Sequence, residues 1–145
     1  RPGLAMLFGA LPDVLAFAPF VVIQILNGEY TPEPPSLDIL PVWTFLAYNF
    51  THSFVSVAVV FILCFYFRRD LLFPLLAWPF HILLDFPFHT KDYFPSHIFW
   101  PISNFFVDGV SWGKPWVWYP NLVGVFIVLG WRFKNRKKVS NYSAR

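Results

Sequence analysis

The chain has 145 residues, of which 57% are hydrophobic, 22% aromatic and only 13% charged. A typical soluble domain has roughly 25% charged residues, so this composition excludes an ordinary soluble enzyme, a coiled coil and a disordered chain. The length suits a single domain. We therefore predict an all-α, polytopic membrane protein: a bundle of about four transmembrane helices over residues 1–138, followed by a basic C-terminal tail at 139–145.

Four apolar segments follow one another along the chain, at residues 4–26, 42–67, 71–88 and 116–131. The first contains Pro12 and Pro19, so a re-entrant hairpin is an alternative to a full span. The second has no Lys, Arg, Asp or Glu over 26 residues. It predicts one helix of roughly 39 Å, which exceeds a hydrocarbon core of about 30 Å. The fourth segment is near the short limit for a span.

The positive charges predict the orientation of these spans. Arg68 and Arg69 separate the second and third segments, and a basic cluster at 132–138 follows the fourth. Because Lys and Arg accumulate on the cytoplasmic side, both sites are expected there, with the C-terminus. The acidic loop 29–38 and the Trp-containing loop 90–115 then face outward. We expect lipids as partners and no nucleic acid, because the basic tail has no interleaved aromatic residues.

Ionisable residues are rare in membrane spans, because the bilayer penalises them by several kcal/mol. Here the first segment contains Asp13, the second His52, and the third His81 and Asp85. In the predicted topology all four lie at mid-depth or in the outer half of the bilayer. Four costly groups from three spans can therefore meet at one level.

This residue set predicts a site for a divalent metal ion. His81 and Asp85 are four residues apart, so they project from one helical face. With His52 and Asp13 they supply two imidazoles and two carboxylates, a set that suits zinc, with manganese or iron as alternatives. His89 is a further candidate ligand; Pro87 ends the regular helix before it.

Each candidate also has a purely structural alternative. Asp13 follows Pro12 and could cap a helix, since Asp is a favoured N-cap. His52 could hydrogen-bond between helices, and His81 with Asp85 could form a plain intramembrane pair. Four further polar residues are expected simply in the outer loop: Lys91, Asp92, His97 and Asp108.

Several motifs, taken in order, resemble a known family. The motifs are Gly9-Ala10-Leu11-Pro12-Asp13, Thr51-His52-Ser53, the run His81–Thr90 with its His81-x-x-x-Asp85 spacing, Trp100-Pro101-Ile102-Ser103 and Gly109-Val110-Ser111-Trp112. This order is similar to that of the small bacterial inner-membrane proteins described as LexA-regulated or LexA-binding, predicted metal-dependent hydrolases. The resemblance extends from Gly9 to Trp112.

The resemblance implies an integral protein of the bacterial inner membrane, with Asp13, His52, His81 and Asp85 as metal ligands or catalytic residues. The family commonly has another histidine before its Pro-Asp motif. No histidine precedes Asp13 in this sequence, so the resemblance implies a ligand that lies outside it.

We hypothesise a metal-dependent hydrolase acting on a lipid or lipid-linked phosphoester. The metal ion would lower the pKa of a bound water. Asp13 or Asp85, whichever is not a ligand, would be the general base.

Two other functions use the same polar groups. One is metal-free proton relay or transport, for which intramembrane His and Asp are also suited. Four spans are few for a transporter, so this alternative predicts a homo-oligomer. The other is a structural membrane protein in which the polar groups only specify helix packing.

Overall fold

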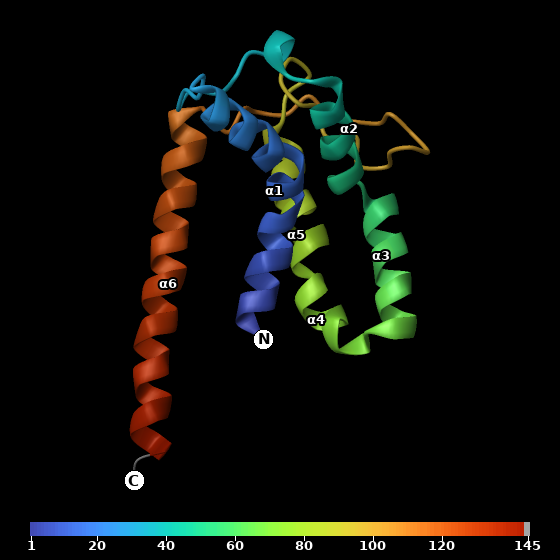
Figure 1. Cartoon of the computed structure of the whole chain (residues 1–145). Helices are drawn as coiled ribbons and strands as arrows, with labels where there is room; N and C mark the ends of the chain where they lie inside the picture. Colours follow the sequence, from blue (N-terminus) through green and yellow to red (C-terminus); the bar gives the residue numbers. More distant parts are fainter. Residues whose placement is uncertain (144–145) are drawn as a thin grey trace. The chain divides into compact units, whose positions relative to one another are not determined.

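The structure is a computed structural model that describes residues 1–143, with side chains described for residues 1–135 (Figure 1). The elements in chain order are α1 (Pro2–Asn27), η1 (Leu37–Ile39), α2 (Val42–Thr51), α3 (Phe54–Phe67), η2 (Arg69–Leu71), α4 (Leu72–Leu75), α5 (Ala77–Asp85), η3 (Phe86–Phe88) and α6 (Pro115–Ser143). Over the described residues there is no strand, only an isolated bridge between Thr90 and Tyr93. The all-α prediction is confirmed.

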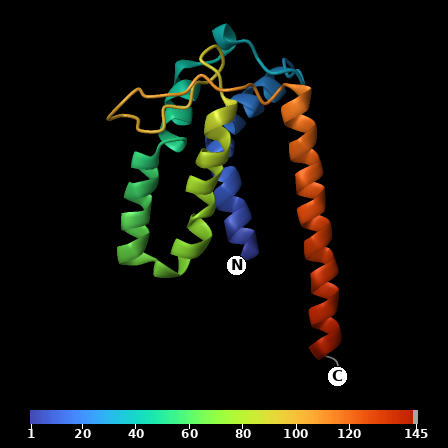
Figure 2. The ribbon, with the colours of Figure 1, turned by 180° about the vertical axis from the view of Figure 1, so that it is seen from behind.

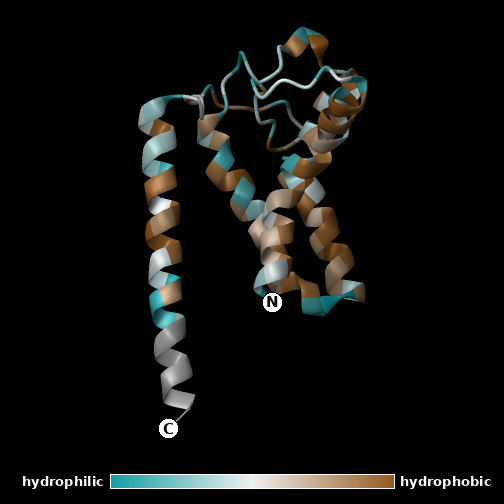
Figure 3. Ribbon diagram, turned by 60° about the vertical axis from the view of Figure 1, so that its left-hand side comes forward, coloured by the Kyte–Doolittle hydropathy of each residue, from teal (hydrophilic) through white to brown (hydrophobic). Residues whose placement is uncertain are grey.

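Two helical segments are long and apolar enough to cross a membrane, α1 and the stretch Arg69–Phe88 that contains α4 and α5. A third is added if α2 and α3 form one bent span. Only 17% of the apolar window of α1 is buried inside the protein, so most of its apolar side chains face outward. Such an exposed apolar surface is compatible with a lipid environment. Figure 3 shows apolar residues along α3 and hydrophilic ones at the turn that follows it.

Helix α1 is continuous through Pro12 and Pro19, so the hairpin alternative is wrong. Prolines are tolerated in apolar helices when neighbouring helices compensate for the lost hydrogen bonds. Helix α1 packs against α5 near Gly9, where an added Cβ would lie 3.7 Å from the Cβ of Ala77. Asp13 lies inside this helix, so the interpretation of Asp13 as a helix cap is also wrong.

The predicted single helix over 42–67 is wrong, because the chain breaks at His52 and Ser53 and bends by 59° between α2 and α3. Polar groups of Ser53 and Phe54, at the start of α3, form hydrogen bonds outside the regular helix pattern. The Ser53 hydroxyl accepts a hydrogen bond from the Val55 amide and donates one to the Trp100 carbonyl. The Phe54 amide donates to the Ile98 carbonyl at 2.8 Å. The loop 89–110, seen from behind in Figure 2, therefore stabilises the break.

The described chain divides into two compact units, Arg1–Val110 and the segment from Ser111 onward, which holds α6. Helix α6 covers the predicted fourth span, but it is not among the described helices that are long and apolar enough to cross a membrane. The number of four spans stays a prediction. So does the basic tail at 139–145, because residues 144–145 and the side chains from Arg136 on lie outside the described part.

Two small clusters of buried side chains form the core of the first unit. One joins α1, the end of η1, α2 and the loop 89–110 through Ala16, Phe20, Leu40, Tyr48 and Phe94. The other joins α3, α4, α5 and the same loop through Val57, Leu75, Trp78, Ile82 and Ile98. The break between α2 and α3 lies between Tyr48 of the first cluster and Val57 of the second. His52, a residue of the candidate site, is at this break.

Candidate metal centre

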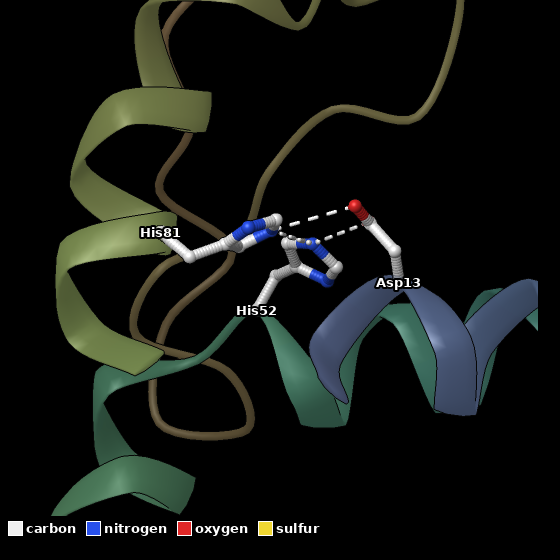
Figure 4. Close-up of side chains that lie close together, drawn as sticks. All are labelled: Asp13, His52 and His81. Atoms are coloured by element: carbon white, nitrogen blue, oxygen red, sulfur yellow. Dashed lines mark hydrogen bonds and ion pairs between the residues drawn. The ribbon is translucent and has the colours of Figure 1, made fainter. Parts of the chain in front are cut away.

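Three of the predicted ligands converge on one point. Asp13 comes from α1, His52 from the residue that ends α2, and His81 from α5. One ligand atom from each residue lies within 4.8 Å of those of the other two (Figure 4). The three residues are close enough to bind one metal ion. The prediction that the polar groups of three apolar segments meet is confirmed for this trio.

The distances within the trio are short. The His52 Nε2 atom lies 3.3 Å from Asp13 Oδ1 and 3.3 Å from His81 Nε2. The His81 Nε2 atom lies 3.8 Å from Asp13 Oδ2. The carboxylate thus presents one oxygen to each ring. The side chain of His52 is 1% exposed and that of Asp13 is 54% exposed, so the cluster opens on the side of Asp13.

The break after α2 orients the His52 ring. Its Nδ1 atom lies 3.1 Å from the Tyr48 carbonyl oxygen, which can only accept a hydrogen bond. The Thr51 hydroxyl, also 3.1 Å from Nδ1, donates to the same carbonyl at 3.2 Å and can accept from the ring. We therefore assign the proton of neutral His52 to Nδ1. Its Nε2 lone pair then faces Asp13 and His81, the orientation that a metal-binding histidine requires.

The donor set fits a divalent ion. Two imidazole nitrogens and one carboxylate oxygen are the ligands of catalytic zinc sites, in which a fourth position stays open. A positive ion would also pair with the carboxylate of Asp13, which lies 3.3 Å from the buried Nε2 atom of His52. The chemistry and the spacing therefore suit a zinc-like ion, and manganese or iron accept the same ligands.

Asp85 and His89 lie next to this trio. Asp85 Oδ2 is 2.8 Å from His89 Nε2 and 3.7 Å from His52 Nε2. Asp85 therefore pairs with His89, the residue four positions later, whereas the polar neighbours of His81 are Asp13 and His52. Burial alone lowers the pKa of His89, but the hydrogen bond and negative charge of Asp85 outweigh it and raise the pKa above its ordinary value.

Tyr48 also supports the centre, although it belongs to none of the sequence motifs. Its ring stacks on the His52 ring with 4.0 Å between centroids, and its buried hydroxyl lies 2.6 Å from the Ser96 hydroxyl. Trp78 donates its ring N–H to the Thr51 carbonyl at 2.7 Å and so ties α5 to the end of α2. The available signal was the spacing of four residues between Tyr48 and His52, which places both on one helical face.

The loop residues lie outside the trio. His97 Nδ1 is 3.0 Å from Asn49 Oδ1, and the Lys91 amide donates to Asp108 Oδ1 at 2.9 Å. Gly109 donates its amide to the His89 carbonyl at 2.8 Å, which ties the loop to the end of η3. The His97–Asn49 contact joins the loop 89–110 to α2, and the other two contacts connect the two ends of the loop to each other.

No protein-family model matches this chain, and no curated protein or solved structure is significantly similar to it. A functional assignment therefore depends on the chemistry of Asp13, His52 and His81 and of the groups around them.

Proposed function

We propose that this chain is a membrane-embedded hydrolase that uses a divalent metal ion, zinc being the best fit, held by Asp13, His52 and His81. The observation that supports it most strongly is the convergence of these three residues, from three separate helices, within 4.8 Å. Such a group is costly in an apolar protein, and a bound cation offsets that cost. The resemblance to the LexA-associated membrane hydrolases of bacteria agrees with this assignment.

A metal ion held by Asp13, His52 and His81 would supply Lewis acidity and would lower the pKa of bound water toward neutrality. The chain supplies the rest. His52 keeps its Nε2 lone pair toward the centre because its Nδ1–H is held by Tyr48. Asp85, 3.7 Å from His52 Nε2, is placed to accept a proton as general base, and His89 at 2.8 Å can pass that proton outward.

The substrate follows from the surroundings. Asp13 and His81 lie in the two helical segments that are long and apolar enough to cross a membrane, so a substrate that reaches Asp13 would come from the lipid phase. We therefore propose a lipid or lipid-linked phosphoester, in a protein of the bacterial inner membrane whose C-terminus is cytoplasmic.

The test is hydrolysis of a panel of phosphoester lipids by detergent-purified protein, with and without chelator. We expect activity in wild type that chelator abolishes and that His81→Ala and Asp13→Asn lose. His97→Ala is the matched control, because this histidine lies outside the trio and should leave activity unchanged. Hydrolysis that His81→Ala leaves undiminished would refute the mechanism.

A metal-free proton relay is the second candidate. One observation favours it: His81, His52, Asp85 and His89 form a chain of groups separated by 3.3, 3.7 and 2.8 Å. Proton flux into proteoliposomes that requires Asp85 and is insensitive to chelator would support the relay over the hydrolase.

A further inference from the structure

A pocket of about 390 Å³ lies between the second half of α1 and the loop that follows it. This volume is within the range of small-molecule sites, roughly 300–1,000 Å³. One wall comes from Phe17, Phe20 and Gln24 of α1. These residues follow Asp13 by four, seven and eleven positions, which places all of them on the face of α1 that carries Asp13.

The opposite wall is the proline-rich loop 29–35, and it is held at both ends. Gly28 ends α1 with a φ of +73°, a left-handed conformation that glycine adopts readily. The Glu29 amide then donates to the Gln24 carbonyl at 2.9 Å, which turns the loop back over α1. At the other end, the Tyr93 hydroxyl donates to the Pro35 carbonyl at 3.0 Å.

The lining of this pocket has a particular chemistry. It combines the aromatic rings of Phe17, Phe20 and Tyr30 with the carboxylates of Glu29 and Glu33. Within the part of the chain that the structure describes, neither carboxylate forms an ion pair. Aromatic faces with nearby negative charge are the environment that binds organic ammonium groups.

The pocket is also close to the candidate metal centre. The ring of Phe17 lies 5.8 Å from that of Tyr48, centroid to centroid, and Tyr48 stacks directly on His52 at 4.0 Å. One aromatic layer therefore separates the pocket lining from a predicted ligand. A molecule that placed a positive group in the pocket could extend along α1 toward Asp13.

We propose that this pocket binds the ammonium group of a zwitterionic phospholipid head group. The role of that lipid as a substrate rests on the proposed hydrolase function, whereas binding does not. The two carboxylates attract the ammonium group, the aromatic rings cover it, and the phosphate of the same head group lies toward the side of Asp13. Phospholipids without a positive head group lack the partner that Glu29 and Glu33 require.

The test measures binding of two short-chain phospholipids with the same acyl chains, one with an ethanolamine and one with a glycerol head group. The protein is the full chain in detergent, as wild type and as the double variant Glu29→Gln/Glu33→Gln. Asp38→Asn is the matched control, because Asp38 belongs to the same loop region but does not line the pocket. Tetramethylammonium serves as a soluble competitor, and every titration is repeated with chelator.

We expect wild type and Asp38→Asn to bind the ethanolamine lipid about tenfold more tightly than the glycerol lipid, and the double variant to lose this preference. Equal affinity for the two lipids in wild type, or a preference that survives in the double variant, would overturn the proposal. Tetramethylammonium that binds as tightly as the lipid would overturn the assignment to a lipid head group.

The two proposals fail separately. A head-group preference that persists with chelator in a protein without hydrolase activity supports the pocket and argues against the hydrolase. Chelator-sensitive hydrolysis with no head-group preference supports the hydrolase and argues against the pocket.

Discussion

The Nε2 atoms of His52 and His81 lie 3.3 Å apart. With His52 protonated on Nδ1, its Nε2 offers a lone pair, so only a proton on His81 or a cation between the rings makes this approach favourable. The carboxylate of Asp13, with one oxygen directed at each ring, favours the cation because it adds a third ligand.

Metal content distinguishes these two possibilities. We expect detergent-purified wild type to retain about one equivalent of a divalent metal per chain, and His81→Ala to lose it because two ligands bind far more weakly than three. The measurement is elemental mass spectrometry on protein purified without chelator. His97→Ala is the control and should keep the wild-type content. Absence of metal from both wild type and control would favour the proton relay.

Part of this site was predictable from the sequence. Asp13, His52 and His81 are ionisable residues in apolar segments, and the cost of placing them in lipid predicts that they have partners. Their shared depth is a prediction from helical rise and from the positions of Arg68, Arg69 and the basic cluster at 132–138. In the described chain, Arg1 at the start of α1 forms an ion pair with Asp70 at 2.7 Å. The start of α1 therefore lies beside the turn that contains Arg68 and Arg69, as the predicted topology requires.

The break at His52 and Ser53 was not predictable in the same way. The segment 42–67 contains no Lys, Arg, Asp or Glu, and neither His52 nor Ser53 is a strong helix breaker. The helix ends there because groups distant in sequence, the carbonyls of Ile98 and Trp100, accept the hydrogen bonds that the bend releases. For the same reason the i, i+4 spacing of His81 and Asp85 identified a shared face but not their partners, which come from other elements.

Asp85 is expected to act on the reaction rather than on metal binding. Asp85→Asn keeps the shape of the side chain but removes its basicity, so we expect metal content to be retained and the hydrolysis rate to fall by about 10²–10⁴-fold. Rapid-mixing kinetics on the active lipid, beside metal analysis of the same sample, measures both. Loss of the metal in Asp85→Asn would instead identify Asp85 as a ligand.

Ser53 is expected to stabilise the bend between α2 and α3. Ser53→Ala removes both the cap of α3 and the hydrogen bond to the Trp100 carbonyl, with an expected cost of about 0.5–2 kcal/mol in the free energy of unfolding. Thermal unfolding in detergent measures it. Ser56→Ala removes a buried hydroxyl from the same helix without removing a cap. Equal destabilisation by the two substitutions would contradict a special role of Ser53.

Gly109 is expected to tolerate no side chain. A Cβ there would lie 2.2 Å from the Pro87 carbonyl oxygen and 2.7 Å from that of His89, and both are backbone atoms that cannot rotate away. We expect Gly109→Ala to displace the end of η3 with His89 and to cost about 1–3 kcal/mol in stability. Gly124→Ala in α6 meets nothing within 4 Å and should be neutral or slightly stabilising. A wild-type unfolding temperature for Gly109→Ala would show that the loop moves freely.

The orientation of the first unit can be tested at its two ends. The loop 28–41 precedes α2, and the turn at 68–70 follows α3. The two segments lie at opposite ends of the pair formed by α2 and α3 (Figure 1). Because Arg68 and Arg69 are expected on the cytoplasmic side, an impermeant thiol reagent should label Glu33→Cys in intact cells. It should label Arg69→Cys only after permeabilisation. Both variants carry Cys64→Ala, which removes the single native thiol. Labelling of both positions from the same side would contradict a membrane-spanning arrangement of α3 and α5, and the reverse pattern would invert the predicted orientation.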